Sequence, residues 1–288
     1  MIAQDFDYLV PTSLSEAVSL LQKRGAGAKI LAGGHSLIPM MKLRLATPEC
    51  LIDIGRITEL SYVNDEGGKI RIGALTTHHQ IETSEVLRQR CQTLSEAAGL
   101  IGDVQVRNKG TIGGSVAHAD PAADYPASLL ALNAMIIAFG PKGERQIPAA
   151  QFFLDMLTTA LEPNELVREI QIPVRTGRIG SAYLKVAQKA SGFAICGASA
   201  VVELDGAGAI SDVAVGITGV SGCAFRASAP EKALKGVKPS AESLQKACER
   251  AADGITPLED IHASGEYRLA LARIYARRAL QQAIERAG

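Results

Sequence analysis

The stretch KILAGGHSLIPMMKLRLATPECLIDI (residues 29–54) places two glycines, Gly33 and Gly34, between short apolar runs. The run KILA predicts a buried strand and LIDI at 51–54 predicts another, while the segment between them fits a glycine-rich turn and a short helix. Strand, turn, helix and strand in this order form a βαβ-like unit. Glycine often stands where another backbone turns tightly or a ligand comes close. The stretch therefore indicates both a fold and a binding site.

Short strands and helices alternate on both sides of this unit. Residues 12–25 predict an amphipathic helix with Thr12 or Ser13 as its N-cap, Glu16 in the capping-box position and Gly25 at its end. Further strands are predicted at 69–75, 134–140 and 165–174, and further helices at 76–90, 91–102 and 121–133.

The C-terminal part of the chain has a different pattern, which follows a glycine- and arginine-rich interruption at 175–181. Alternating runs predict an antiparallel sheet at 181–188, 198–204 and 210–220, and helices follow at 229–236, 240–254 and 264–287. We therefore expect an α+β protein with two domains, at 1–177 and 178–288. The last helix carries four arginines, Arg268, Arg273, Arg277 and Arg278. By default they are expected to form a solvated helix face, and the alternative is that they form a docking surface.

The composition excludes several classes of function. Of the 288 residues, 47% are hydrophobic and 21% are charged, as in globular proteins. The 30 basic and 30 acidic residues cancel, whereas a nucleic-acid binder normally has a basic excess. No apolar run reaches the roughly 20 residues that cross a bilayer, and MIAQDFDYLVPTS lacks the regions of a signal peptide. We therefore expect no nucleic acid and no membrane span.

The cysteines and histidines indicate no metal centre in this chain. The five cysteines are scattered, so no iron–sulfur cluster or structural zinc is expected on Cys50, Cys91, Cys196, Cys223 and Cys248. Their odd number is typical of a protein of the reducing cytoplasm, where each is expected to be a small buried hydrophobe. Metal-ligand spacing with carboxylates is lacking at His78, His79, His118 and His262.

The glycine pair recurs in GTIGGSVAHADPAADYPASLLAL (residues 110–132). In both stretches the glycines let backbone N–H groups approach an anion, and a helix that starts just afterwards directs its positive end to the same spot. Two such loops predict one ligand held between them, and a dinucleotide diphosphate fits because backbone amides can satisfy phosphate. Further donors are the hydroxyls of Ser36, Thr111 and Ser115.

Other motifs narrow the choice, and some residues keep two interpretations. AGGHSLIPMMK matches neither the P-loop pattern nor G-x-G-x-x-G. G-x-S-x-G is missing and no serine or cysteine has an evident base, which disfavours a hydrolase. Asp124 either accepts hydrogen bonds from a ribose or, like Asp120, caps a helix. His35 either contacts phosphate or a flavin edge, or it has a structural role in the turn.

The two glycine stretches, AGGHSLIPMMKLRLATPECLIDI and GTIGGSVAHADPAADYPASLLAL, closely resemble the FAD-binding medium subunit of the molybdenum hydroxylases. This family includes the flavoproteins of xanthine dehydrogenase, carbon monoxide dehydrogenase and quinoline oxidoreductase. The resemblance covers nearly the whole chain, including EPNELVREIQIP at 162–173. It implies a FAD-binding domain of the vanillyl-alcohol-oxidase (PCMH) type at 1–177 and a domain like the C-terminal one of carbon monoxide dehydrogenase flavoproteins at 178–288.

The resemblance also implies which residues contact FAD. The loops around the diphosphate would supply Lys29, Ile30, Leu31, Ala32, Gly33, Gly34, His35 and Ser36 from the first stretch, and Thr111, Gly113, Gly114 and Ser115 from the second. Asp124 matches a ribose-binding aspartate and Ile101 an apolar residue on the adenine side. Three further residues match family positions at the isoalloxazine ring, namely Val167, Lys185 and Phe193. The chain departs from several relatives at Ser115, where they have Asn, and from many members at Gly192, where they have Asp.

The function implied by the resemblance is electron transfer within a larger oxidoreductase. Substrate would be hydroxylated at a molybdenum cofactor in a large subunit. Electrons would pass through two [2Fe–2S] clusters of a small subunit to FAD in this chain and on to an external acceptor. The family implies a dimer of such heterotrimers, and no catalytic residue or metal ligand is expected here. The run AHADPAAD departs from typical carbon monoxide enzymes and favours another substrate.

Two other functions compete with this one. The first is a self-sufficient FAD-dependent oxidoreductase that acts on a small molecule, which would need its own substrate pocket and acid–base groups. The second is a non-redox module that binds a nucleotide or assembles partners.

Overall fold

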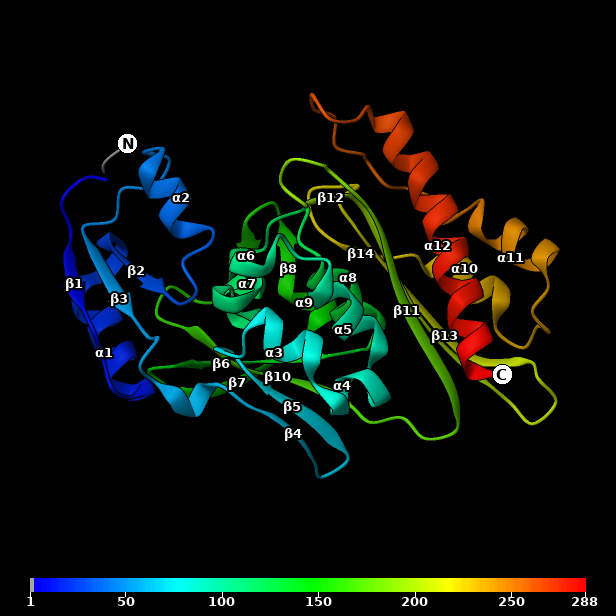
Figure 1. The fold of residues 1–288 in the computed structure, drawn as a ribbon, viewed down its shortest axis with the longest axis horizontal. Helices are drawn as coiled ribbons and strands as arrows, with labels where there is room; N and C mark the ends of the chain where they lie inside the picture. The colour runs from blue at the N-terminus through cyan, green and yellow to red at the C-terminus, as the bar shows by residue number, and fades with distance from the viewer. Residues whose placement is uncertain (1–2) are drawn as a thin grey trace.

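Three sheets follow one another along the long axis of the molecule, with helices between and outside them (Figure 1). The computed structural model describes residues 3–288. The first sheet is parallel and has the strand order β1-β3-β2. Its elements are β1 (Asp7–Leu9), α1 (Leu14–Arg24), a 3-10 turn (Gly25–Gly27), β2 (Ala28–Leu31), α2 (Leu37–Lys42) and β3 (Cys50–Asp53). The predicted βαβ-like unit is confirmed as β2, α2 and β3.

Helix α1 forms where the sequence predicts it. Ser13 is the N-cap, and its side chain accepts a hydrogen bond from the backbone N–H of Glu16, 3.2 Å away. The Glu16 carboxylate accepts from the N–H of Thr12 at 2.8 Å, so the reciprocal bond of the predicted capping box falls one residue earlier than expected. The predicted apolar face is buried and consists of Leu14, Ala17, Val18 and Leu21.

The second sheet is antiparallel, in the order β4-β5-β10-β6-β7. A 3-10 turn (Thr58–Leu60) leads to its strands, which are β4 (Val63–Glu66), β5 (Lys69–Gly73), β6 (Met135–Gly140), β7 (Gly143–Pro148) and β10 (Leu166–Pro173). Strands β5, β6 and β10 confirm the predicted ones. The two edge strands, β4 and β7, escaped prediction because they are largely polar and exposed.

Short helices lie between the second and third sheets (Figure 1). They are α3 (His78–Thr83), α4 (Glu85–Arg90), α5 (Gln92–Gly99), α6 (Val104–Lys109), α7 (Ile112–His118), α8 (Tyr125–Ala131) and α9 (Ala149–Phe152), and a small hairpin follows, β8 (Phe153–Asp155) with β9 (Thr158–Thr159). The single helix predicted at 76–90 is wrong, because Ser84 leaves the helical conformation and caps α4 through its side chain.

The third sheet is antiparallel, as predicted, with the order β11-β12-β13-β14. Its strands are β11 (Arg178–Ala187), β12 (Ala194–Leu204), β13 (Ile210–Thr218) and β14 (Phe225–Arg226), and the helices after it are α10 (Ser228–Leu234), α11 (Ala241–Cys248) and α12 (Gly265–Ala287). Helix α12 packs along β11 and β12 on the outer face, whereas α5 and α8 pack against the sheet from the inner side (Figure 1).

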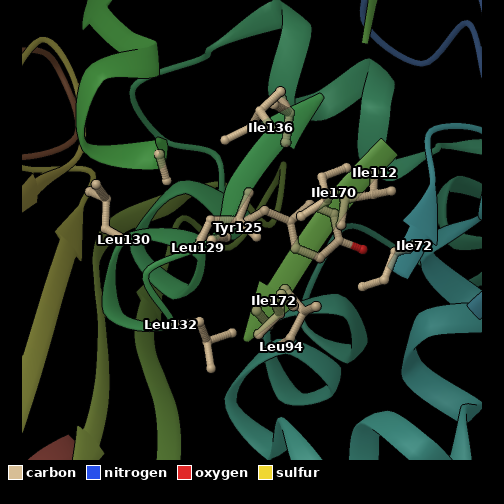
Figure 2. Packing of buried hydrophobic residues seen from close by; sticks show 14 of the residues in the cluster. Ile72, Leu94, Ile112, Tyr125, Leu129, Leu130, Leu132, Ile136, Ile170 and Ile172 are labelled. Carbon is tan, nitrogen blue, oxygen red and sulfur yellow. The ribbon is translucent and has the colours of Figure 1, made fainter. Parts of the chain in front are cut away.

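One hydrophobic core joins the second sheet, the intervening helices and the inner face of the third sheet. Its centre is Tyr125, whose ring lies near Ile72, Ile112 and Ile170 (Figure 2). The same cluster includes residues of the third sheet, namely Tyr183, Val201 and Ala214. The predicted boundary at 177/178 falls in the connection between β10 and β11. The exact position of this boundary stays a prediction. Side chains from both halves of the chain contribute to the one core.

The expectation of a solvated arginine face on α12 is wrong for Arg268. This side chain is only 4% exposed, and its guanidinium donates to the carbonyls of Ile195 and Gly219 and to the carboxylate of Asp260. Arg268 therefore ties the start of α12 to the ends of β12 and β13. Arg273 and Arg278 are exposed and Arg277 is partly buried.

Candidate functional site

A cavity of about 710 Å³ lies where the two glycine loops meet. Its volume is within the range of small-molecule and cofactor sites. All the residues that the sequence assigns to the cofactor line it except Lys185. The cavity thus brings together both glycine loops, Ile101, Asp124, Val167 and Phe193. Other lining residues that sequence reasoning missed include His78, Gly110, Leu157 and Leu161.

The two glycine loops touch each other through their backbones. A methyl group on Gly33 would lie 2.7 Å from Gly110 Cα and closer still to the carbonyl oxygen of Lys109. A methyl group on Gly113 would lie 2.7 Å from the carbonyl oxygen of Ala74. These glycines therefore allow close packing of one chain segment on another. Gly34 differs because its φ of 75° lies in the left-handed region.

The backbone amides of the two loops are not equally available to a ligand. Among the described residues, the N–H groups of Gly33 to Ser36 have no backbone partner, so they can donate to a bound anion. The second glycine pair lies inside the first turn of α7 rather than before it. The N–H groups of Ile112, Gly113, Gly114 and Ser115 donate, in that order, to Thr76 O, Ala74 O, Thr111 Oγ1 and Thr111 O.

The expectation that amides of both loops grip a diphosphate is therefore corrected for the second loop. Its amides already have partners within the chain, at 2.9 to 3.2 Å. What this loop offers is the hydroxyl of Ser115 and that of Thr111, together with a backbone that lies close against the first loop. The first loop supplies the free amides.

Asp124 and Lys185 form a buried ion pair at one corner of the cavity. Lys185 Nζ lies 2.9 Å from Asp124 Oδ1, and the side chains are 3% and 5% exposed. The Tyr183 hydroxyl donates to the same carboxylate at 2.6 Å. Burial raises the pKa of Asp124 to about 6, although the Lys185 ammonium and the Tyr183 hydroxyl both oppose the rise. Asp124 makes no capping bond to α8, so the capping interpretation is wrong for it.

Lys185 uses its remaining hydrogens inside the chain. It donates to the carbonyls of Leu100 and Gly192, each at 2.7 Å. An ammonium group has three donors, and Asp124, Leu100 and Gly192 occupy them. Lys185 therefore acts on the cavity by holding its walls, and the direct contact with the flavin that the resemblance implies stays a prediction.

The loop between β11 and β12 forms part of the cavity mouth. Gly192 has a φ of 75°, and a methyl group there would lie 3.3 Å from Gly102 Cα, so glycine suits this position better than the Asp of many relatives. Phe193 lines the cavity and is 46% exposed. Contact between Gly102 and Gly192 brings Ile101 and Phe193 to the same corner. The structure does not separate these two residues into an adenine side and a ring side.

His78 and Tyr125 are the titratable pair that sequence reasoning missed. His78 Nδ1 lies 2.9 Å from the Tyr125 hydroxyl. Burial lowers the pKa of His78 to about 4, so its imidazole is neutral near pH 7. Burial also raises the pKa of Tyr125 well above its usual value, which keeps the phenol protonated. The residues are far apart in the sequence, and although Tyr125 lies in the second glycine stretch, nothing in that stretch indicates its bond to His78.

The donor set and shape of the cavity fit a dinucleotide such as FAD. Free amides and hydroxyls gather at the meeting point of the glycine loops, where they suit a diphosphate. Apolar walls for aromatic rings come from Ile101, Leu161, Val167 and Phe193. Polar groups fixed in an otherwise apolar cleft are typical of cofactor sites.

The remaining expectations concern metals, cysteines and membranes. Within residues 3–288, His, Cys, Asp and Glu side chains nowhere form a group of three or more that could hold a metal ion. Burial raises the thiol pKa of Cys91, Cys196 and Cys248 to about 12, whereas Cys223 is only partly buried. None of the helices described has the length and apolar character that crossing a bilayer requires.

Comparison with known families gives two consecutive matches. Residues 4–175 match the family described as FAD binding domain in molybdopterin dehydrogenase. Residues 181–283 match the CO dehydrogenase flavoprotein C-terminal domain. Together the matches cover nearly all of the chain, in the order that the sequence predicts.

Individual relatives agree with the family matches. The carbon monoxide dehydrogenase medium chain of Hydrogenophaga pseudoflava is 41% identical over 98% of both chains. The 6-hydroxypseudooxynicotine dehydrogenase complex subunit alpha of Paenarthrobacter nicotinovorans is 37% identical over 98% of this chain and 95% of its own. A solved structure of the Hydrogenophaga pseudoflava carbon monoxide dehydrogenase, which lacks the Mo-pyranopterin moiety, matches with a TM-score of 0.97 and 43% identity over all of both chains.

These relatives are named for different substrates at similar identity. The likeness therefore does not select a substrate, and the expectation against carbon monoxide gains no support from it.

Proposed function

The chain belongs to the FAD-binding medium subunits of the molybdenum hydroxylases, and we propose that it holds FAD in the cavity between the glycine loops as the electron-transfer site of a multi-subunit oxidoreductase. The single observation that carries the proposal is the convergence of both loops on one cavity with free amides on its first loop. When bound, FAD supplies reversible uptake of one or two electrons.

The residues of this chain would position the cofactor and control its surroundings. Amides of Gly33 to Ser36 would hold the diphosphate, with the Ser115 hydroxyl opposite them. Ile101, Val167 and Phe193 would cover its apolar parts and exclude water. Asp124 would accept hydrogen bonds from a ligand hydroxyl on whichever lone pairs Tyr183 and Lys185 leave open. These roles need no proton transfer by the protein.

The proposed partners are two other kinds of subunit. A small subunit would carry two [2Fe–2S] clusters and deliver electrons to this chain, and a large subunit would carry the molybdenum cofactor and hydroxylate the substrate. An external acceptor would receive the electrons, in a dimer of heterotrimers. Support comes from relatives named as a medium chain and as a subunit of a dehydrogenase complex.

Purification of the native complex tests this proposal. We expect three co-purifying polypeptides, iron and molybdenum in the preparation, and an oxidised-flavin absorption spectrum that stays with this chain after the subunits are separated. Extraction of the isolated chain should release FAD, identified by chromatography. A nucleotide without a flavin would favour the non-redox module, and steady turnover of a small molecule by the isolated chain would favour the self-sufficient oxidoreductase.

A further inference from the structure

His78 stands at the junction of the two glycine loops, although neither loop contains it. Its backbone N–H donates to the carbonyl of Gly110 at 2.9 Å. A methyl group on Gly110 would lie 2.5 Å from His78 Nε2, so the imidazole lies directly against this glycine. Gly110 in turn is the residue against which Gly33 packs. The imidazole edge that carries Nε2 is therefore next to the point where the loops meet.

Tyr125 determines which nitrogen of His78 carries the proton. Tyr125 is completely buried, and its ring lies among isoleucines of the core (Figure 2). Within the described residues, the Tyr125 hydroxyl has His78 Nδ1 as its hydrogen-bond partner. A buried hydroxyl that fails to donate is costly, so the O–H donates to Nδ1. A neutral imidazole that accepts at Nδ1 carries its hydrogen on Nε2.

That Nε2–H lacks an acceptor within the described part of the chain. His78 is only 5% exposed, yet it lines the cavity. Nε2 is not among the fully buried side-chain atoms without a partner, so it keeps some exposure. Because His78 lines the cavity, a ligand or water there can accept from this N–H. The acceptor must come from the cavity, on the side where the free amides of Gly33 to Ser36 also gather.

We propose that His78 Nε2–H donates a hydrogen bond to the diphosphate of the bound dinucleotide, and that Tyr125 positions it by fixing the tautomer. This inference rests on the proposed function, because it names a contact within the same cavity. His78 is thus a binding residue contributed by α3, and Tyr125 is a positioning residue contributed by α8.

Paired variants separate this contact from the packing of the core. Tyr125→Phe removes the buried hydroxyl but keeps the imidazole. His78→Phe combined with Tyr125→Phe removes the donor as well, without leaving a stranded hydroxyl. His79→Phe is the matched control, since His79 is the neighbouring histidine and its side chain is 52% exposed. ADP and riboflavin serve as probes, because only ADP carries the diphosphate.

Calorimetry on the full chain stripped of cofactor measures the affinity of each variant for ADP, FAD and riboflavin. We expect the double variant to bind ADP and FAD about tenfold more weakly than Tyr125→Phe does, with riboflavin affinity changed less than about twofold. His79→Phe should match the wild type. Equal ADP affinity of the double variant and Tyr125→Phe would overturn the contact. Failure of the wild type to bind FAD or ADP would instead overturn the proposed function.

Nitrogen-15 NMR of the wild type supplies a test that does not depend on folding of the variants. We expect His78 to carry its proton on Nε2 at pH 7, and that resonance to shift when ADP is added but not when riboflavin is added. A proton on Nδ1, or a resonance indifferent to ADP, would contradict the proposal.

Discussion

Lys185 Nζ lies 2.9 Å from Asp124 Oδ1, and both side chains are almost completely buried behind the cavity wall. The pair joins β11 of the third sheet to the start of α8, which belongs to the region before the 177/178 connection. Through Leu100 and Gly192, the same ammonium reaches the end of α5 and the loop at the cavity mouth. One side chain therefore fixes three segments of the wall relative to one another.

Lys185→Met should destabilise the protein strongly. The substitution leaves the buried Asp124 carboxylate without its cation and two carbonyls without a donor. Breaking a buried pair from one side costs about 3–5 kcal/mol, which urea unfolding of the cofactor-free chain would measure. Lys189→Met, at an exposed position in the loop that follows β11, is the control and should change the free energy of unfolding little. Equal stability of the two variants would contradict the central place given to Lys185.

Asp124 should make the stability depend on pH between about 4 and 6. Its pKa is raised to about 6 in the folded protein, whereas its usual value is 3.8. As the pH rises through this window the unfolded state loses its proton first, so folding loses about 3 kcal/mol that is present at lower pH. Well above pH 6, where both the folded and the unfolded state have lost the proton, this contribution changes no further.

Asp124→Asn isolates that effect, because the amide keeps the size of the side chain and does not titrate. The free energy of unfolding of the wild type, minus that of the variant, should fall from pH 4 to pH 6 and then level off. Parallel pH profiles for the two proteins would show that burial does not raise the pKa of Asp124.

Gly33→Ala should separate the two glycine loops. The added methyl would overlap the backbone at Lys109 and Gly110, and overpacking of this kind costs about 1–3 kcal/mol. We expect a lower melting temperature and weaker FAD retention on gel filtration. Gly206→Ala is the matched control, because a methyl there meets no atom within 4 Å. Full retention of FAD by Gly33→Ala would argue against contact between the loops as a condition of binding.

Arg268→Met should lower stability without affecting the cavity directly. The carbonyls of Ile195 and Gly219 would lose a charged donor, at a cost of about 2–4 kcal/mol. Arg273→Met, on the exposed side of α12, should be nearly neutral. Thermal unfolding measures the stability of both variants. Similar melting temperatures would show that Arg268 does not hold α12 against the ends of β12 and β13.

Much of this fold follows from local sequence, and the exceptions have physical causes. Strands with buried apolar residues, such as β6 and β10, and helices with one apolar face, such as α1, carry periodic signals. Polar edge strands do not. The glycine pairs predict a binding site. They do not indicate that the backbone amides of the second loop already donate hydrogen bonds within the chain.

The finer parts of the site depend on contacts between segments that are distant in sequence. The strand pattern around Lys185 predicts only a residue that faces inward. Nothing in the neighbouring sequence indicates its hydrogen bonds to Leu100 or Asp124. The bond between His78 and Tyr125 spans 47 positions and exists only because α3 and α8 pack together. Arg268 reads as one of several helix arginines, and only the course of β12 and β13 around it explains its burial.

The shared core has a mechanical consequence. Helix α8 carries Asp124 at its start, and its Ala127 carbonyl packs so closely on Gly216 of β13 that a methyl group there would overlap it. A swing of residues 1–177 against the remainder would have to break this seam and expose apolar surface. The cavity therefore lies in a stiff frame, and the distance from a cofactor held in it to the protein surface is set by this frame rather than by opening and closing.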